Sequence, residues 1–146
     1  MKIVLGSDHG GFEVKEKIKE VINNHGMEVI DVGCDNKDSC NYAFFGIKAA
    51  KKVASKEADF GIVICGSGIG ISIAANKVKT IRCGIAYDDE VTRLMRVHND
   101  ANMIAFGARF MSEEDILRRV KIFLEARFEG GRHLERIQKI TEEENK

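Results

Sequence analysis

Short apolar runs alternate with amphipathic stretches along the whole chain. The apolar runs are rich in β-branched residues and predict five strands, at residues 2–7, 27–32, 60–65, 81–86 and 102–106. After each run, apolar positions recur with the period of a helix, which predicts helices over residues 12–25, 42–55, 69–77, 88–98 and 112–128. Gly130 and Gly131 break the last of these helices, and a charged segment, residues 132–146, follows.

The regular alternation of strand and helix predicts how the chain is arranged. Five strand–helix units favour an α/β fold with a five-stranded parallel sheet, helices on both faces and right-handed crossovers. Because the chain has no repeat, linker or low-complexity tract, we expect residues 1–146 to form one domain, with a C-terminal helical arm over about residues 130–146. Ligands bind such sheets at the carboxyl ends of the strands, here residues 8–9, 65–70 and 87–89.

Composition narrows the classes of function. The 146 residues carry 23 basic and 23 acidic side chains, so the net charge indicates neither a nucleic-acid nor a membrane-surface partner. No apolar run reaches the ~18 residues of a membrane span and no leader opens the chain, so we expect a cytoplasmic protein. The cysteines form no C-x-x-C pair, which predicts free thiols and neither a zinc site nor a redox pair. They are Cys34, Cys40, Cys65 and Cys83.

The sequence CGSGIG, residues 65–70, places a thiol and three glycines at the end of the most apolar strand. A dinucleotide fingerprint needs G-x-G-x-x-G after the first strand, and although Asp88 lies at a suitable distance for a ribose contact, the chain has no second half for a nicotinamide and its substrate. A P-loop needs lysine and then serine or threonine after its last glycine, where this chain has Ile71 and Ser72. A cysteine phosphatase needs an arginine six residues after Cys65, and that position is also Ile71.

What remains is a ring of backbone N–H groups at a helix N-terminus, with the Cys65 thiol beside it and the Ser67 hydroxyl as a further donor. Such a ring stabilises negative charge, which favours the thiolate form of a neighbouring cysteine and lets it act as a base. Enediolate chemistry requires a base beside an anion-binding loop, because charge develops on the carbonyl oxygen when the α-proton leaves. The alternative is that Cys65 is buried packing and the glycines form only a tight turn.

Two histidines and an aspartate are further candidates. Asp8 and His9 lie at a strand-to-helix turn, where a helix start can hold a phosphate within reach of His9, although a plain N-cap explains Asp8 equally well. His98 ends a helix, where a histidine often serves only as a partner of the helix dipole. His25 fits that ordinary role, and we assign it no function.

Three arginines are candidate anion ligands. Arg132 and Arg136 lie four residues apart on a helix that follows the flexible Gly130–Gly131 pair, so both can face one anion. A solvated helix face is the simpler interpretation of these two arginines. Arg109, just after the fifth strand, is the third candidate.

Five segments carry a resemblance to a known family. In order along the chain they are GSDHGGFEVK, EVIDVG, GIVICGSGIGISIAANK, VHNDANMIAFGAR and FEGGRHLERI. From Met1 to about Ile140 the chain resembles the B-type ribose-5-phosphate isomerases, whose relatives act on allose and galactose 6-phosphates. The resemblance implies a Rossmann-like three-layer fold without a nucleotide, a homodimer or dimer of dimers with sites at the subunit interface, and an aldose–ketose isomerisation without metal or other cofactor.

The resemblance also implies a role for each candidate residue. Cys65 corresponds to the base that moves a proton between C2 and C1. The loop of Gly66, Ser67, Gly68 and Gly70 corresponds to the hole for the enediolate, and Asp8 and His98 to the ring-opening pair. Contacts to the sugar and its phosphate fall, by the same resemblance, to His9, Tyr42, Asn99, Arg109, Arg132 and Arg136.

The chain departs from the family pattern in two places. Ser67 stands where threonine is usual, which keeps the hydroxyl. Asn41-Tyr42-Ala43 stands where Asp-Tyr-Pro is usual, which replaces a carboxylate by an amide and makes the loop less rigid. Substrate preference is therefore the feature that the resemblance fixes least.

The resemblance favours a self-sufficient homo-oligomer that interconverts D-ribose 5-phosphate and D-ribulose 5-phosphate in the non-oxidative pentose phosphate pathway. In the galactose-6-phosphate relatives the essential residues are divided between two different chains, whereas here Cys65, His98 and both C-terminal arginines share one chain. One alternative is an isomerase of allose or galactose 6-phosphate with the same mechanism. Another is a non-catalytic sugar-phosphate-binding module, against which the intact Cys65 and His98 argue.

Overall fold

Five parallel strands form one sheet in the computed structural model, which describes residues 1–36 and 38–146. The strands are β1 (Lys2–Ser7), β2 (Glu28–Asp31), β3 (Phe60–Cys65), β4 (Cys83–Ile85) and β5 (Met103–Gly107). Their order across the sheet is β2-β1-β3-β5-β4. Each strand overlaps a predicted one, and the predicted five-stranded parallel sheet is confirmed.

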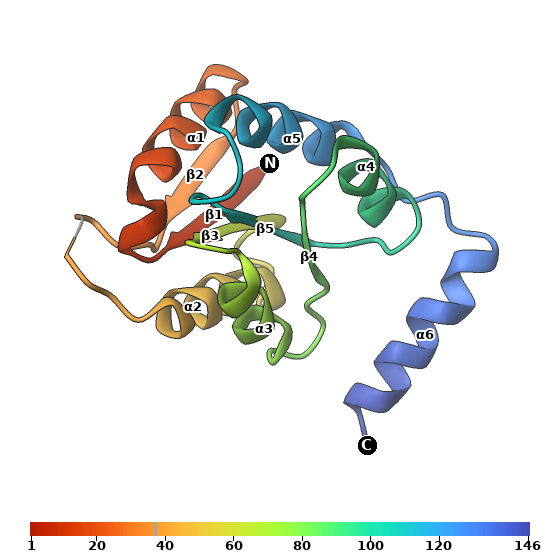
Figure 1. The fold of residues 1–146 in the computed structure, drawn as a ribbon. Coiled ribbons are helices and arrows are strands. Elements are labelled where there is room, and N and C mark those ends of the chain that lie inside the picture. Colours follow the sequence, from red (N-terminus) through yellow and green to blue (C-terminus); the bar gives the residue numbers. More distant parts are fainter. Residues whose placement is uncertain (37) are drawn as a thin grey trace.

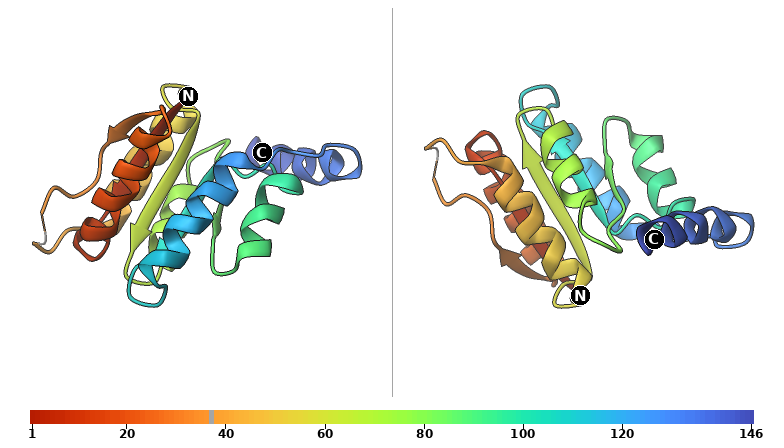
Figure 2. Two further views of the ribbon diagram at one scale, coloured as in Figure 1. Left: turned by 90° about the horizontal axis from the view of Figure 1, so that it is seen from above. Right: turned by 90° about the horizontal axis from the view of Figure 1, so that it is seen from below.

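Helices cover both faces of this sheet. They are η1 (His9–Gly11), α1 (Phe12–Asn24), α2 (Tyr42–Ala54), α3 (Ile69–Asn76), α4 (Asp89–Val97), α5 (Glu113–Glu125) and α6 (Arg132–Glu144). Figures 1 and 2 show α1, α4 and α5 on one face, α2 and α3 on the other, and α6 extending from the body beyond α4. The predicted three-layer α/β fold is therefore confirmed. Among the described residues, no helix combines the length and apolar character needed to cross a bilayer.

The central strand β3 presents alternate side chains to the two helical layers. Ile62 and Ile64 belong to the core formed with α1 and α5, whereas Val63 and Cys65 belong to the core formed with α2 and α3. All four side chains are buried, because a central parallel strand is covered on both sides. This explains why the run FGIVIC is continuously apolar, and it puts the Cys65 thiol at the end of a fully packed strand.

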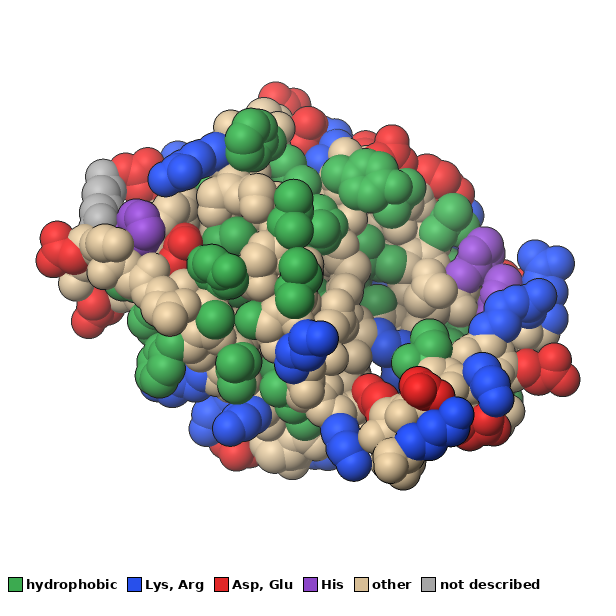
Figure 3. Space-filling model, turned by 60° about the horizontal axis from the view of Figure 1, so that its bottom comes forward, with side chains coloured by type: hydrophobic (Ala, Val, Ile, Leu, Met, Phe, Trp, Pro, Cys, Tyr) green, Lys and Arg blue, Asp and Glu red, His purple; other side chains and the backbone are tan. Residues whose placement is uncertain are grey.

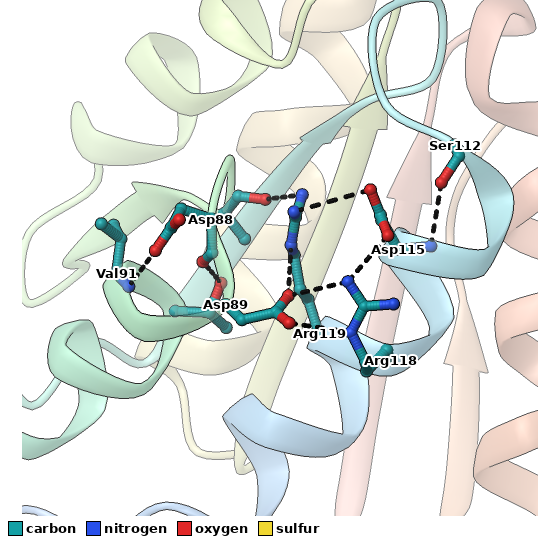
Figure 4. A network of polar contacts seen from close by, with 9 residues as sticks. Asp88, Asp89, Val91, Ser112, Asp115, Arg118 and Arg119 are labelled. Atoms are coloured by element: carbon teal, nitrogen blue, oxygen red, sulfur yellow. Dashed lines mark hydrogen bonds and ion pairs between the residues drawn. The ribbon is translucent and has the colours of Figure 1, made fainter.

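Two arginines of α5 hold the start of α4 (Figure 4). The Asp89 carboxylate accepts hydrogen bonds from Nε of Arg118 and Nε of Arg119, both at 2.9 Å, and Arg119 Nη1 also donates to the Ala86 carbonyl. Hydrogen bonds from Arg118 and then Arg119 lower the pKa of the Asp89 carboxyl below its ordinary value. In the sequence, Glu114 and Asp115 lie four residues before Arg118 and Arg119, a spacing that predicts ion pairs on a solvated helix face. The prediction is wrong for Arg119, which is buried because its side chain reaches from α5 to the end of β4.

A lysine is buried where α1 begins. Lys15 is 1% exposed, and its Nζ lies 2.7 Å from Oδ2 of Asp31 at the end of β2. Burial by itself raises the pKa of Asp31, but hydrogen bonds from Lys15, Lys19 and the Gly33 N–H outweigh it and leave that pKa below its ordinary value. The ion pair therefore fixes α1 against β2 in the charged state.

The helix predicted over residues 112–128 ends earlier than expected. Its last residue is Glu125, and Ala126 is already extended, with φ −72° and ψ 150°. The Glu129 N–H donates to the Val97 carbonyl at the end of α4, with 3.0 Å between nitrogen and oxygen. The chain therefore leaves α5 early because the segment before α6 is bound to α4.

Two cysteines differ from expectation. Cys34 and Cys40, which were predicted to be free thiols, form a disulfide. Both ends of their loop are anchored beside β1, because the Cys34 N–H donates to the Ser7 carbonyl and the Cys40 N–H donates to Nδ1 of His9. The sequence spacing could not show this return of the loop to β1. The remaining two cysteines are free thiols.

Candidate active site

The Cys65 thiol lies at the carboxyl end of β3, the middle strand of the sheet. It is 4% exposed and accepts a hydrogen bond from the Gly68 N–H, with 3.1 Å between nitrogen and sulfur. The glycine loop therefore holds a backbone donor against this sulfur. Burial raises the pKa of Cys83 on the edge strand β4 to about 12, so that thiol stays protonated.

The glycine loop, residues 66–70, leads from this thiol into α3. Gly68 is the N-cap of α3 and has a φ of 83°, a left-handed conformation that favours glycine. Gly107 of β5 lies so close to the Ser67 backbone that a side chain would not fit there. The Ile69 N–H donates to Ser67 Oγ at 3.2 Å, which leaves the hydroxyl hydrogen available to a ligand. The loop thus presents donors from a backbone that its neighbours hold in place.

Asp8 and His9 follow β1, the neighbour of β3. Asp8 is 7% exposed, and its Oδ1 accepts a hydrogen bond from the Gly10 N–H at 2.9 Å, which makes it the N-cap of η1. Nδ1 of His9 accepts from the Cys40 N–H at 3.1 Å, so the proton of the neutral ring is on Nε2. That nitrogen is then a donor, as an anion ligand must be.

A cleft of about 580 Å³ opens above these groups at the carboxyl edge of the sheet. Tyr42, at the start of α2, packs its ring against Gly70, and the Arg109 side chain lies over Gly66. Oδ1 of Asn41 accepts a hydrogen bond at 2.9 Å from the N–H two residues on, so the amide at this position caps α2 and holds Tyr42 at the cleft. The predicted residues that line the cleft are Asp8, His9, Tyr42, Cys65, Gly66, Ser67, Gly70 and Arg109.

Three other predicted residues, His98, Arg132 and Arg136, form a second cluster where α4 ends and α6 begins. His98, the C-cap of α4, stacks on His133, with ring centroids 4.2 Å apart and planes inclined by 17°. Burial lowers the pKa of His133, and His98 and Arg132 act in the same direction. Arg132 and Arg136 lie one turn apart on α6, and Arg136 Nη1 donates to the Arg132 carbonyl at 2.6 Å. Asn99 follows His98 and lines a separate groove beside α6.

The two clusters lie at opposite edges of the sheet. In a strand–helix unit the chain leaves the carboxyl end of the strand, and the helix returns it to the amino edge. Cys65 therefore lies at the carboxyl edge, whereas His98, at the C-terminal end of α4, lies at the amino edge, where the Gly61 N–H of β3 donates to the Asn102 carbonyl. Helix α5 also returns the chain to the amino edge before α6. Figure 3 shows histidine side chains on opposite sides of one face.

Four residues beside these clusters were not predicted from the sequence. Phe110 and Ile69 line the cleft although both are apolar, and Phe110 is 80% exposed. Only their positions in the sequence could have indicated this, since Phe110 follows Arg109 and Ile69 lies in the glycine loop. Glu129 and His133 lie beside His98, and no sequence pattern indicates this because their position depends on how α6 docks.

Known proteins share this arrangement over nearly the full chain. The family described as Ribose/Galactose Isomerase matches residues 3–140. Ribose-5-phosphate isomerase B of Escherichia coli (strain K12) is 42% identical over 140 residues, which cover 96% of this chain and 94% of that protein.

Solved structures extend the similarity to three dimensions. Ribose-5-phosphate isomerase B of Clostridium thermocellum is 48% identical, with a TM-score of 0.98 and coverage of 99% of this chain and 98% of that one. Ribose-5-phosphate isomerase B of Mycoplasma genitalium, solved with bound ribulose-5-phosphate, is 35% identical, with a TM-score of 0.95 and coverage of 99% and 97%. The matches include both clusters, from β1 to α6. This chain therefore belongs to the ribose/galactose isomerase family.

Proposed function

We propose that this protein interconverts D-ribose 5-phosphate and D-ribulose 5-phosphate. One observation carries the proposal. The Cys65 thiol accepts a hydrogen bond from the Gly68 N–H, and it lies in a cleft that is also lined by the donors His9 and Arg109. The full-length similarity to ribose-5-phosphate isomerase B, including a relative with ribulose-5-phosphate bound, supports a pentose phosphate as the substrate. On the same grounds we assign the protein to the cytoplasm and to the non-oxidative pentose phosphate pathway.

The proposed reaction moves a proton between two neighbouring carbons. Asp8 and His98 act as the acid–base pair that opens the sugar ring. The Cys65 thiolate takes the proton from C2, and the electron pair moves through the C1–C2 bond onto O1. N–H groups of the glycine loop and the Ser67 hydroxyl hold the negative charge of the enediolate. A proton then passes from O2 to O1, Cys65 returns its proton to C1, and the aldose has become the ketose with every atom conserved.

A complete site, in this proposal, needs two copies of the chain. Cys65 and His98 belong to opposite edges of one sheet, so His98, Asn99 and the arginines of α6 serve a cleft on a second subunit. Figure 3 shows hydrophobic side chains gathered on the face formed by α2 and α3, and Ile69 and Ile73 of α3 are among the exposed ones. An exposed apolar face of this kind supports association. The partner is then a second copy, in a homodimer or a dimer of dimers.

Substrate comparison tests the proposed function. The purified protein is expected to turn over ribose 5-phosphate with a kcat/KM at least about 10-fold higher than for allose 6-phosphate or galactose 6-phosphate, since one extra carbon group in a fitted pocket changes specificity by about 10–200-fold. Ketose formation from each sugar is measured at equal protein concentration. Faster turnover of a hexose phosphate would favour the hexose alternative, and binding without turnover would favour a sugar-phosphate-binding module.

The arginines of α6 are expected to act through the phosphate group. Arg132→Ala or Arg136→Ala should raise KM for ribose 5-phosphate roughly 10-fold or more, because a hydrogen bond to a charged group is worth ~1.5–3 kcal/mol. Any turnover of free ribose should be unchanged, since it has no phosphate to bind. The matched control is Lys139→Ala, which removes an exposed cation of the same helix that pairs with Glu142. If all three variants keep the wild-type KM, the phosphate contacts must lie at His9 and Arg109.

A further inference from the structure

Three side chains from distant parts of the sequence meet in the second cluster. His98, Glu129 and His133 each offer one metal-ligating atom, and these atoms lie within 4.8 Å of one another. Backbone contacts fix the arrangement: the Glu129 N–H donates to the Val97 carbonyl at 3.0 Å, beside His98. His133 stacks on His98, so their in-plane nitrogen lone pairs run side by side and one ring must turn out of the stack before both reach the same ion. Two imidazoles and a carboxylate make up the donor set of open, three-ligand zinc sites.

One of these imidazoles has an unsatisfied nitrogen. His133 is 7% exposed, and within the described part of the chain no group bonds its Nε2. A buried polar nitrogen without a partner lowers the stability of the folded protein, because its lost hydration is not replaced. A bond to a metal ion would offset this cost. Zinc bonds of 2.0–2.1 Å require ligand atoms about 3.3 Å apart, so the three groups, now within 4.8 Å of one another, must move closer together. Glu129 is exposed and His98 is half-buried, so both side chains have room to rotate toward His133.

The donor set selects the kind of ion. Arg93 interacts electrostatically with Glu129, and Arg132 with His133, so positive charge is already present beside the cluster. Hard cations such as Mg²⁺ and Ca²⁺ depend on several oxygen ligands, of which this cluster offers only a single carboxylate. Zinc gains most of its affinity here from neutral imidazole nitrogens. The donor set therefore fits zinc better than an alkaline-earth ion.

We infer that His98, Glu129 and His133 form a zinc-binding site and that zinc bound there blocks the isomerase. The inhibitory part rests on the proposed function, in which His98 helps to open the sugar ring. An imidazole nitrogen bonded to zinc can neither accept nor donate a proton, so the ring-opening step stops. The metal-independent mechanism is kept, because the ion is an inhibitor and takes no part in turnover.

Zinc binding is measured first, without reference to activity. Zinc chloride titrated into the metal-free, full-length protein in a phosphate-free buffer should bind at one ion per chain. His133→Gln and Glu129→Gln should each weaken binding at least about 10-fold, since loss of a mere supporting partner of a metal ligand costs about 10–100-fold. His25→Gln and Glu125→Gln are matched controls that should keep the wild-type affinity. Glu129→Gln changes an exposed side chain, so the test survives if the buried His133 variant does not fold.

Cobalt and kinetics provide the second readout. Bound Co²⁺ should show visible d–d bands without the thiolate charge-transfer band that cysteine ligands would give. Zinc should inhibit isomerisation, measured against each variant's own metal-free rate, and inhibition should need at least about 10-fold more zinc in the two ligand variants. Equal zinc affinity in all variants, or a thiolate band that disappears in Cys65→Ala, would overturn the inference. Selective zinc binding by a chain that does not isomerise ribose 5-phosphate would refute the proposed function and its inhibition while leaving the metal site in place.

Discussion

The Cys65→Ala variant is expected to lose about 10²–10⁴-fold in kcat for ribose 5-phosphate, the usual contribution of a positioned base, with KM changed no more than a few-fold. The thiol has one role in the proposed reaction, to move the C2 proton, whereas the phosphate is bound by other side chains. Steady-state kinetics in both directions measure the effect. Thermal unfolding of the same sample shows whether the buried strand end still packs.

Cys83→Ala is the matched control for this variant. It removes the other free thiol, which lies on the edge strand β4, and burial keeps that thiol protonated, with its pKa raised to about 12. Its kcat should equal that of the wild type. If Cys65→Ala retains more than about a tenth of wild-type kcat, well above the loss expected for a general base, Cys65 is not the base.

Mixing two inactive variants is expected to restore activity. Cys65→Ala disables the carboxyl-edge half of the site and His98→Gln the amino-edge half, so a mixed dimer contains one doubly damaged site and one intact site. Random exchange in a two-fold symmetric dimer makes about half of the dimers mixed, so total activity should reach about a quarter of wild type. The rate is measured after the two proteins are unfolded together and refolded, or after co-expression.

The control for mixing uses two variants of the same half-site. Cys65→Ala and Asp8→Asn both act at the carboxyl edge, so every mixed dimer has two damaged sites and no recovery is expected. Recovery with His98→Gln but not with Asp8→Asn would establish that the site is shared between subunits. Equal absence of recovery in both mixtures, with subunit exchange verified, would show that each subunit works alone and that the opposite-edge argument fails.

The sequence predicted the features that depend on short stretches of chain. Strand and helix periods follow from which side chains face the core, and the carboxyl-edge rule then selected Asp8, His9 and the glycine loop. Features that depend on contacts between distant segments were not predictable. The Lys15–Asp31 ion pair needs α1 to lie on β2, the burial of Arg119 needs α5 to lie on β4, and the meeting of His98 with His133 needs α6 to dock at the end of α4. No local pattern encodes these contacts.

The backbone packing of the glycine loop bears on how the surroundings respond when charge moves during the proposed reaction. Gly107 lies against the Ser67 backbone, and Gly68 lies against the backbone of Phe106 at the end of β5. In water, solvent dipoles must reorient around a new anion, and this reorganisation energy is a large part of the barrier to forming it. Amides that are already held by close backbone contacts have little left to reorient. The glycines therefore contribute to the rate through the rigidity of the loop as well as through their N–H groups.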